Sequence, residues 1–588
     1  MDEETARTLM EKMPPFDPAL FPSPHGFTRI GTGSPGSKAL GLAAVREVLE
    51  ERFAPSFRPD IDVRIPPLAV ITTDLFDSFV QQNDLHRLVL SDGSDDEVER
   101  AFREASLPRQ LVHVLRTFLA RVHLPLAVRS SSLLEDDVDK PLANVYSTSM
   151  VPNNQADTSA RLEALLRAIK RVYASTYFRT ARNVIRDAGY SPDDQKMAVV
   201  LQEVVGSPFG ERFYPHISGV LRSYNFYPTG LARPEEGLVH LALGLGRTIV
   251  EDGIAWVCSP AHPYANPPYT SVPSLLKHTQ KEFWAIDMRG SPQSVSGGVA
   301  GTDHLRKWSL AEAEQDGALR VVASTYKADD DRIVPGIDTE GPRIVDFAPI
   351  LKHKLIPLDR LLPALLETCE ETLRGMVEVE FAVSLGERPG APARFGFLQL
   401  RPMAVSQVIV DVPPEDLVSR NVLLASESVL GNGLVDTLCD VVYVRPERFD
   451  SKETRSIAGE LETINRELVA AGRSYILIGF GRWGTTDPQC GIPVVFGQIS
   501  GAKVLVESTL PDLHLMLSQG THFFHNLVSS RAVYFSVEHG GRFRIDWEWL
   551  GRQPRVAETP FLRHVRALAP LTVKVDGRTG RGVISHES

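Results

Sequence analysis

The feature that most constrains the fold is a pair of strand-like runs that ends at Arg401. In the first run, Val377–Val383, apolar residues alternate with two carboxylates. Because successive side chains of a strand point to opposite faces, the apolar residues take one face, and Glu378 and Glu380 take the other. The second run follows a turn rich in Gly and Pro, and its Gln399 and Arg401 share a face with each other.

This pattern has two interpretations. Carboxylates two residues apart lie about 7 Å from each other, here beside an amide and a guanidinium. Magnesium prefers one or two carboxylates together with phosphate oxygens, and arginine suits a phosphoryl group in transfer. The hairpin would then hold magnesium against a polyphosphate. The alternative is an amphipathic hairpin whose charged face lies in solvent, and the strand pair alone does not decide between them.

Composition excludes several classes of protein. The 588 residues predict three to four folding units, and 43% hydrophobic with 23% charged residues is typical of a globular chain. A net charge of −11 argues against a general nucleic-acid binder. No apolar run reaches the roughly 18 residues of a membrane helix, and the four cysteines form no C-x-x-C pair. We therefore expect a cytoplasmic protein that binds neither nucleic acid nor a membrane.

Helical and strand-like patterns alternate along the chain, which indicates an α+β layer structure. The stretch 260–345, rich in Pro, Gly and Ser, follows no clear period, and the run 410–415 has the composition of a domain boundary. The segments expected to be helical are 97–122, 160–187 and 358–374, and those expected to be strands are 124–128, 197–202, 441–444, 475–478, 503–506 and 532–537.

Two other segments have the composition of phosphate-binding loops. The glycine-rich loop Gly31–Lys38 precedes a helical pattern, so its backbone N–H groups and the charge of Lys38 could face an anion. It lacks the Gly before Lys and the Ser/Thr after it that define a Walker A loop, and a plain turn has the same composition. The run Val128–Asp136 carries Arg129 and three serines into a polar turn. It is either a phosphate cradle or an exposed loop.

Taken together, these segments resemble a known family. Lys38 in Gly-Ser-Lys-Ala-Leu-Gly-Leu, Arg129 in Val-Arg-Ser-Ser, and Gln399-Leu-Arg-Pro resemble the ATP-grasp nucleotide-binding domain of the phosphoenolpyruvate synthase and pyruvate phosphate dikinase family. The resemblance covers about residues 20–405. Further segments that are similar to that family are Leu142–Tyr146, Met197–Val205, Ser218–Leu221 and Gly244–Val250.

The resemblance implies a fold and a set of ligands. The fold would be an ATP-grasp core of two subdomains, 26–195 and 196–409, after an extended lead-in, 1–25. A C-terminal α/β unit of unknown role would follow at 416–588. The cofactors would be ATP and Mg²⁺.

The resemblance also implies a role for each matching residue. Lys38 and Arg129 would contact the phosphates, and Arg401 would steady the transferring phosphoryl group. The family often has glutamate, associated with the nucleotide's sugar, where this chain has Arg247, so ribose contacts and nucleotide preference stay open. The magnesium ligands would be Glu380 and Gln399 with Glu378 in support, and the adenine would be lined by Gln202, Glu203 and Val205.

The family's dikinases pass the phosphoryl group to a histidine in a Gly-rich Thr-Ser-His loop. The nearest analogue here is Ser518-Gln-Gly-Thr-His522, which continues into two phenylalanines. His522 and His525 are three residues apart and are candidate phosphoacceptors, although ordinary packed or exposed histidines fit the same pattern. We expect a protein that lacks the family's phosphohistidine and pyruvate-binding domains.

A glycine motif in the C-terminal part has alternative interpretations. Gly479–Gly484 matches G-x-G-x-x-G, but Pro488, Gly491 and Pro493 follow where a dinucleotide site needs a helix. Two interpretations therefore remain: a structural loop that packs around Trp483, or a loop that binds a phosphorylated acceptor.

The function that fits best is an ATP-dependent phosphotransferase, either a kinase or a dikinase. The phosphoacceptor would be a residue of the C-terminal unit, a small molecule or another protein. One alternative is a non-catalytic ATP sensor that signals through its C-terminal unit. Another is a subunit that works with a separate phosphohistidine protein.

Overall fold

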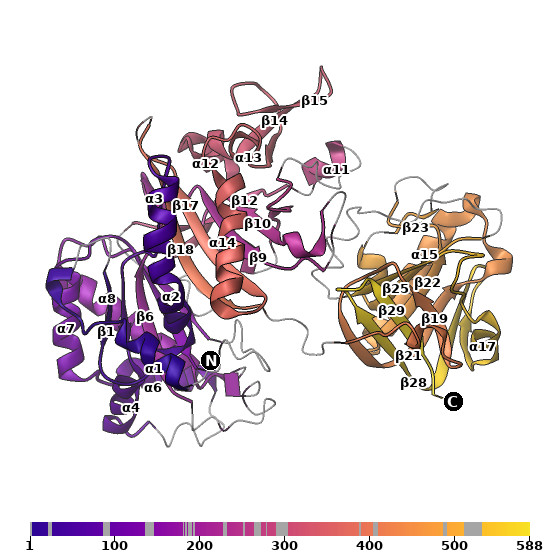
Figure 1. Ribbon diagram of the computed structural model, residues 1–588, viewed down its shortest axis with the longest axis horizontal. Helices are drawn as coiled ribbons and strands as arrows, with labels where there is room; N and C mark the ends of the chain where they lie inside the picture. Colours follow the sequence, from indigo (N-terminus) through magenta and orange to yellow (C-terminus); the bar gives the residue numbers. More distant parts are fainter. Residues whose placement is uncertain are drawn as a thin grey trace. The chain divides into compact units, whose positions relative to one another are not determined.

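A computed structural model describes most of the chain, which divides into two compact units. Unit 1 comprises Met1–Ser223, Gly237–Tyr264 and Leu275–Met403, and unit 2 comprises Tyr224–Glu236, Ala265–Ser274 and Ala404–Ser588. Figure 1 colours both along the sequence. The described residues are 3–20, 26–85, 94–133, 135, 146–179, 181–182, 185, 191, 195–226, 228, 232–250, 253–263, 272–277, 279–289, 304–386, 388, 390–403, 410–485, 491–494, 496–510 and 532–587.

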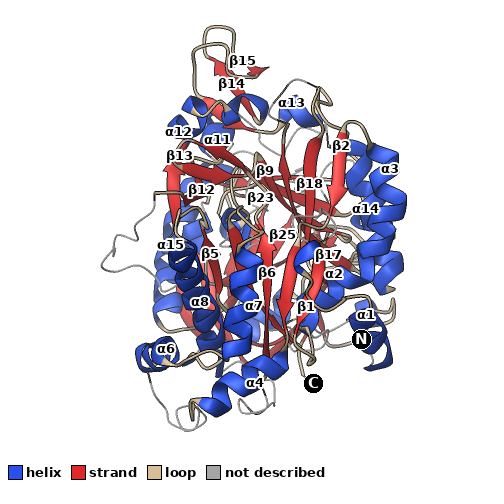
Figure 2. Ribbon diagram, turned by 90° about the vertical axis from the view of Figure 1, so that its left-hand side faces the viewer, coloured by secondary structure: helices blue, strands red, loops and turns tan. Residues whose placement is uncertain are grey.

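The first sheet of unit 1 brings together strands that are distant in sequence. Its order is β1-β3-β6-β4-β5, and only the β1–β3 pair among these is parallel. The helices α4, α7 and α8 cover one side of it through buried residues such as Phe79, Leu115 and Ile169 (Figure 2). The strands are β1 (Phe27–Ile30), β3 (Leu68–Ile71), β6 (Met197–Glu203), β4 (Leu126–Ser132) and β5 (Thr148–Val151), and the helices are α4 (Thr73–Gln82), α6 (Asp95–Glu104), α7 (Arg109–Leu119) and α8 (Thr158–Ser175).

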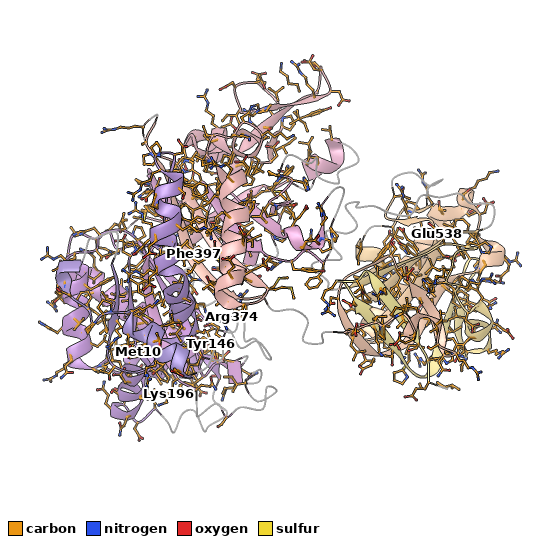
Figure 3. The ribbon with its side chains drawn as sticks, in the orientation of Figure 1. Met10, Tyr146, Lys196, Arg374, Phe397 and Glu538 are labelled. Atoms are coloured by element: carbon orange, nitrogen blue, oxygen red, sulfur yellow. The ribbon has the colours of Figure 1, made fainter. Side chains whose placement is uncertain are left out.

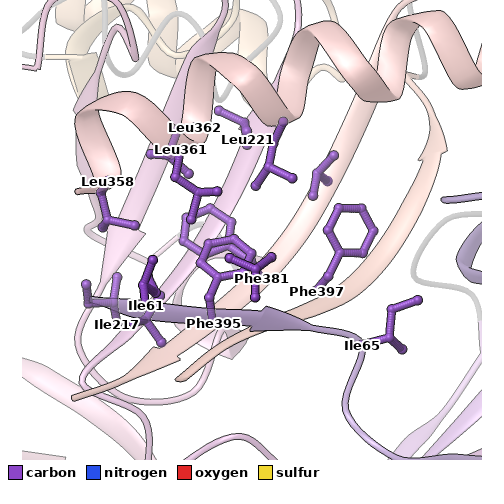
Figure 4. Close-up of a cluster of buried hydrophobic side chains, with 14 of the residues drawn as sticks. Ile61, Ile65, Ile217, Leu221, Leu358, Leu361, Leu362, Phe381, Phe395 and Phe397 are labelled. Atoms are coloured by element: carbon purple, nitrogen blue, oxygen red, sulfur yellow. The ribbon is translucent and has the colours of Figure 1, made fainter. Parts of the chain in front are cut away.

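The second sheet of unit 1 contains the hairpin expected from the sequence. Its order is β11-β10-β9-β17-β18-β2, and β2 joins β18 in parallel. Helix α14 (Leu358–Leu373) lies across one face, where Leu358, Leu361 and Leu362 point at Phe381 and neighbouring rings (Figure 4). The strands are β11 (Trp256–Cys258), β10 (Leu238–Ala242), β9 (Ile217–Arg222), β17 (Val377–Ser384), β18 (Ala393–Pro402) and β2 (Ile61–Arg64).

The stretch 260–345, which no sequence period describes, contains short strands and helices. The strand β12 pairs with β13 and β8, and β14 pairs with β15 and β16. Strands of three to six residues are too short for a clear alternation. The elements in this stretch include α11 (Val272–Lys277), β12 (Glu282–Asp287), β13 (Leu305–Ser309), α12 (Leu310–Gln315), β14 (Ala323–Lys327), β15 (Arg332–Pro335) and β16 (Arg343–Val345). The strands β7 (Ser207–Phe209) and β8 (Arg212–Tyr214) precede the stretch, and α13 (Ala348–Leu351) follows it.

The expected helix 97–122 is wrong as a single element. It is two helices, α6 and α7, because Pro108 stands at the N-terminus of α7 and disfavours helical geometry in the residue before it. Helix α6 starts with a capping box, in which the Ser94 hydroxyl accepts from the Glu97 backbone N–H and the Glu97 carboxylate accepts from that of Ser94. No described helix is long and apolar enough to cross a membrane.

Unit 2 is built around a mixed sheet. Four adjacent strands, β21, β22, β25 and β26, pair in parallel, and β28 adds to β21 in the antiparallel sense. Helix α15 (Thr454–Ala470) buries Leu461 and Ile464 against this sheet. The strands are β19 (Val422–Ser426), β20 (Val429–Leu430), β21 (Gly433–Val444), β22 (Tyr475–Phe480), β25 (Ala502–Ser508), β26 (Val533–Val537), β27 (Arg555–Glu558), β28 (Leu562–Asp576) and β29 (Arg581–Ser585).

Candidate functional site

Unit 1 contains a cavity of about 520 Å³ between its two main sheets. Its walls come from β4 and β6 of the first sheet and from β9, β17 and β18 of the second. Tyr146, labelled in Figure 3, also lines it. Of the residues named from the sequence, those that line the cavity are Lys38, Arg129, Gln202, Glu203, Val205, Arg247, Glu380, Gln399 and Arg401.

The β17–β18 hairpin presents its polar face to this cavity. Glu378 pairs with Arg401 and Glu380 pairs with Gln399 in the strand register. The side chains of Glu378 and Arg401 are only 8% and 18% exposed, and Gln399 is 2% exposed as a residue. A charged face in open solvent would be far more exposed, so that alternative for the hairpin is wrong. The opposite face, with Val379 and its neighbours, is core as expected.

A β-bulge in β18 decides which residues reach the cavity. The register shifts between Glu380 and Phe381, so that Leu398 has no partner across the ladder. Before the bulge Phe397 faces the core, and after it Gln399 faces the cavity although the two are two residues apart. The bulge also leaves the Leu398 carbonyl available, and this oxygen accepts a hydrogen bond from Arg129 Nη1 at 2.9 Å.

Arg129 links the two sheets across the cavity. Its Nη2 donates to Glu380 Oε2 at 2.9 Å and to Gln399 Oε1 at 2.7 Å, and its Nη1 also donates to Gln202 Oε1 at 3.3 Å. Its side chain is 13% exposed. A guanidinium with its donors in a fixed fork is suited to such a position, because a lysine could not satisfy these acceptors together. These partners come from β6, β17 and β18, segments that are distant from Arg129 in the sequence.

Lys38 reaches the cavity from the first turn of α2 (Gly36–Val48). Its ammonium forms an ion pair with Glu135, and the two side chains are 9% and 6% exposed. Glu135 also accepts a hydrogen bond from Ser130 Oγ at 3.3 Å. Sequence reasoning did not name Glu135. In the sequence Glu135 is simply a carboxylate six residues after Arg129. Many polar turns contain such a carboxylate, so the pattern does not single it out.

The glycine-rich loop before α2 binds an anion that the protein supplies itself. The backbone N–H groups of Thr32 and Gly33 donate to the Asp74 carboxylate at 3.1 and 2.8 Å, and that of Ser34 donates to Thr73 Oγ1. Burial raises the pKa of Asp74, but the hydrogen bonds from Thr72, Gly33 and Thr32 more than offset this and the net pKa is lowered. The loop is therefore a structural turn, and only the Lys38 side chain after it reaches the cavity.

The three serines after Arg129 also serve the fold. Ser131 Oγ donates to the Pro35 carbonyl at 2.9 Å, and Ser37 Oγ donates to the Ser132 carbonyl at 2.7 Å. These bonds fasten the start of α2 to β4. Gly36 has φ +76°, and a Cβ there would overlap the Ser131 carbonyl oxygen, so this approach requires glycine. These bonds position Lys38, and none of the three serines lines the cavity.

Glu378 does not line the cavity but fixes one residue that does. Its Oε1 accepts from Arg401 Nε at 2.9 Å and its Oε2 accepts from Arg222 Nε at 2.7 Å. Burial raises the pKa of Glu378, but the two guanidinium groups outweigh burial and lower the pKa to about 2. Glu378 is therefore ionised and keeps Arg401 oriented. Arg222 was not named from the sequence, because only strand pairing brings β9 beside β17.

The other end of the cavity is apolar. Ala127, Val204, Leu245 and Leu305 belong to one small hydrophobic cluster and line this end. Glu203, at the end of β6, lies beside it. Burial raises the pKa of Glu203 to about 7, although Arg64 and Arg394 act in the opposite direction. An apolar pocket next to a strand end is suited to a heterocyclic ring.

Arg247 stands at the rim of this end. Its guanidinium lies 4.4 Å from the centre of the Trp284 ring, and the Lys307 ammonium lies 5.2 Å from the same ring. Cations over an indole face are stabilised by its quadrupole. Trp284 was not predicted, because it lies in the stretch 260–345 that the sequence pattern leaves unassigned.

A divalent cation fits the donor set at Glu380 and Gln399. Both side-chain oxygens converge on one nitrogen of Arg129, which shows that they can share a cation. One carboxylate and one amide oxygen leave further positions for phosphate oxygens and water, as magnesium prefers. The described residues contain no cluster of three or more His, Cys, Asp or Glu with metal-site geometry.

The sequence candidates in the C-terminal part are two histidines and a glycine-rich loop. His522 and His525 lie outside the described residues. In the Gly479–Gly484 loop, Trp483 is 1% exposed and its backbone N–H donates to Glu507 Oε1 at 3.0 Å. The short strand β23 (Arg482–Trp483) follows β22, where a dinucleotide site needs a helix. The described part of the loop thus packs around Trp483, as one of the two interpretations expects.

Comparison with known proteins agrees with this geometry. No curated protein matches the chain. A family model described as pyruvate phosphate dikinase, AMP/ATP-binding domain matches residues 34–420, about two thirds of the sequence. The match extends from the loop before Lys38 to beyond Arg401 and so includes every cavity residue named above. The chain therefore belongs to the family of the pyruvate phosphate dikinase AMP/ATP-binding domain.

Proposed function

We propose that this protein is an ATP-dependent phosphotransferase whose unit 1 is an ATP-grasp nucleotide-binding core. ATP would lie in the 520 Å³ cavity with its adenine at the apolar end and its phosphates among Lys38, Arg129 and Arg401. The observation that carries the proposal is this convergence, because three cations from three distant segments of the chain line one cavity. Membership of an AMP/ATP-binding family supports it.

The adenine end has the features that a purine requires. Gln202, Glu203 and Val205 line it together with the apolar cluster around Leu245. The backbone beyond β6 can offer a carbonyl and an N–H to the edge of the base, while the apolar side chains cover its faces. In this orientation Arg247, which lies over Trp284, would be the residue nearest to the ribose.

The phosphate end would act by positioning and charge. Glu380 and Gln399 would hold Mg²⁺, which when bound offsets charge on the phosphate oxygens. Lys38 and Arg129 would bind the phosphates from the side of the first sheet. Arg401, oriented by Glu378, would stabilise charge that builds up on the transferring phosphoryl group. Preorganised charges of this kind need no rearrangement during the reaction.

The acceptor is a second part of the proposal. We propose that the protein is cytoplasmic and that its phosphoacceptor is a small molecule or a protein. A protein acceptor could be a separate protein that carries a phosphohistidine domain. The ligand is a nucleotide, and neither nucleic acid nor a membrane is needed as a partner.

The test uses the full-length protein with Mg²⁺ and ATP labelled separately at the β- and γ-phosphates, alone and with cell extract. Transfer of γ-label to an extract component with release of ADP would establish a kinase. Release of AMP with β-label on a protein would establish dikinase-type transfer, and acid-labile label at His522 or His525 would identify the acceptor. ATP binding with no turnover under any condition, unchanged by Arg401→Ala, would rule out the enzyme and leave a nucleotide sensor.

A further inference from the structure

We propose that Arg129 and a divalent cation compete for the same two oxygens, so that metal binding is coupled to nucleotide binding through this arginine. The proposal rests on the function proposed above. It assigns to Arg129 a second role besides contacting phosphate: it guards the metal position until a polyphosphate draws its guanidinium away.

The geometry that points to this role is the sharing of one nitrogen. Arg129 Nη2 lies 2.9 Å from Glu380 Oε2 and 2.7 Å from Gln399 Oε1. A magnesium ion bound to both oxygens would lie about 2.1 Å from each. On the side of the two oxygens where Nη2 lies, such an ion would overlap the space that Nη2 occupies. The ion and the guanidinium nitrogen therefore exclude each other by size as well as by like charge.

The rest of the guanidinium has partners that do not depend on the metal ligands. Arg129 Nη1 donates to the Leu398 carbonyl at 2.9 Å and to Gln202 Oε1 at 3.3 Å, and both acceptors are neutral. When Nη2 leaves Glu380, the arginine keeps these bonds and needs a new anion only for Nη2. The phosphates proposed to enter the same cavity supply that anion.

The other two cations assigned to the phosphates are arranged differently. Lys38 pairs with Glu135, and Arg401 pairs with Glu378, so each has a carboxylate other than the proposed metal ligand. They carry the same charge in the same cavity, and they therefore separate direct competition from a general electrostatic effect. Of the three, Arg129 should control access to the metal ligands.

Coupling of this kind is reciprocal. If phosphate increases the affinity for the metal by releasing Glu380, the metal increases the affinity for phosphate by the same factor, because it releases Arg129. A tenfold effect corresponds to about 1.4 kcal/mol. The chain would thus bind metal alone weakly and metal with nucleotide tightly.

The test measures Mn²⁺ binding to the full-length protein without nucleotide, from the electron paramagnetic resonance signal of unbound Mn²⁺. We expect Arg129→Gln to bind Mn²⁺ at least tenfold more tightly than the wild type. We expect Lys38→Gln and Arg401→Gln, each of which removes one cation from the cavity, to change the affinity less than threefold. Adding Glu380→Gln to the Arg129→Gln variant should abolish the gain.

Arg129→Lys provides a second variant, because it keeps the charge but cannot span Leu398 and Glu380 together. Its Mn²⁺ affinity should lie between those of the wild type and Arg129→Gln, and circular dichroism confirms that each variant is folded. Equal gains in all three charge variants, or none in Arg129→Gln, would overturn the competition.

Glu380→Gln assayed with a non-hydrolysable ATP analogue separates this proposal from the proposed function. We expect Glu380→Gln to weaken Mn²⁺ binding in the presence of the analogue. This result would support the metal site at Glu380 even if the competition between Arg129 and the cation had been overturned. If Glu380→Gln has no effect there, the metal site itself fails, and the competition fails with it.

Discussion

At the scale of single residues, the site consists of ion pairs that serve different purposes. Glu135 holds Lys38, Glu380 holds Arg129, and Glu378 holds Arg401. Of these carboxylates, Glu378 is shared between two arginines and set behind the cavity. A buried pair of this sort contributes orientation more than net stability, but removing one partner leaves the other charge buried and uncompensated.

We expect Glu378→Gln to lower the stability of unit 1 by about 3 kcal/mol at pH 7, since Arg222 and Arg401 lose their shared counter-charge. The pKa of Glu378 lies at about 2 in the fold against an ordinary 4.5. Its contribution is therefore complete above pH 4.5 and is lost as the pH falls through 2. Hydrogen exchange of the β17 amides measures the loss.

The matched control is Glu47→Gln. Glu47 also pairs with a cation, Lys12, but its side chain is 59% exposed. An exposed pair is worth at most about 1 kcal/mol, so this variant should change stability by about 0.5 kcal/mol or less. A loss in Glu378→Gln no larger than in Glu47→Gln would contradict the positioning role.

The stability that Glu203 contributes depends on pH in the opposite direction to that of Glu378. Its pKa is raised by burial to about 7, so the folded chain keeps a proton that the unfolded chain releases near pH 4.5. Stability contributed by this group is complete below pH 4.5 and is lost as the pH rises through 7. Glu203→Gln mimics the protonated form. It should match the wild type at pH 4.5 and melt at a higher temperature at pH 8.

Thermal melts at the two pH values check this expectation. The control is Glu211→Gln, whose side chain is 62% exposed and which should change neither melt appreciably. A melting-temperature difference between Glu203→Gln and the wild type that is the same at pH 4.5 and pH 8 would show that Glu203 does not titrate in this window.

At the scale of elements, the sequence predicts β17, β18 and α14 well. Alternating residues such as Val379 mark a half-buried strand, and Leu358, Leu361 and Leu365 recur at helical spacing. The pattern cannot show which strands become neighbours. The pairing of β6 with β3 and β4, and of β2 with β18, joins segments that are distant in the sequence. The partners of Arg129 follow from this pairing, so they could not be read from the sequence.

The docking of α2 onto β4 depends on Gly36. We expect Gly36→Ala to destabilise unit 1 by more than about 2 kcal/mol and to weaken ATP binding at least tenfold, because the new Cβ displaces α2 and with it Lys38. Gly317 has nearly the same φ, +75°, and a Cβ there would meet nothing within 4 Å. Gly317→Ala should therefore cost only the strain of the left-handed conformation, about 1 kcal/mol.

Thermal melts and titration with a fluorescent ATP analogue measure both effects. Since the two alanines would have nearly the same φ, the difference between the variants measures mainly the contact with Ser131. Equal destabilisation of the two variants would mean that the close approach of α2 to β4 does not limit the fold.

At the scale of the whole molecule, unit 2 is not continuous in sequence. The segment Tyr224–Glu236, which follows β9, belongs to it. Phe226 accepts a hydrogen bond from Gly431 N–H at 3.2 Å through its carbonyl, and its ring packs on Tyr224 with centroids 4.7 Å apart. The chain passes into unit 2 after Met403, ahead of the run 410–415, and it also passes between the units within the connection from β9 to β10.

We expect Phe226→Ala to loosen unit 2. Hydrogen exchange at the start of β21 and the end of β28 should become about tenfold faster, while β3 and β6 of unit 1 keep their rates. Phe209→Ala is the converse control, because Phe209 packs on Tyr214 within unit 1. Faster exchange in both units of the Phe226→Ala variant would show that the segment does not act as part of unit 2 alone.

The bulge at Leu398 has a consequence for how this protein can change over evolutionary time. A strand with an even alternation would carry Gln399 and Arg401 on the same side as Phe397, inside the hydrophobic layer. The extra residue at the bulge, Leu398, reverses this alternation, so that Gln399 and Arg401 face the cavity. Loss of the Leu398 codon would therefore leave Gln399 and Arg401 on the cavity side, now by plain alternation with Phe397 and Leu400, but it would remove the backbone carbonyl to which Arg129 donates. The spacing of these residues, as much as their identity, therefore determines which backbone and side-chain groups the cavity holds.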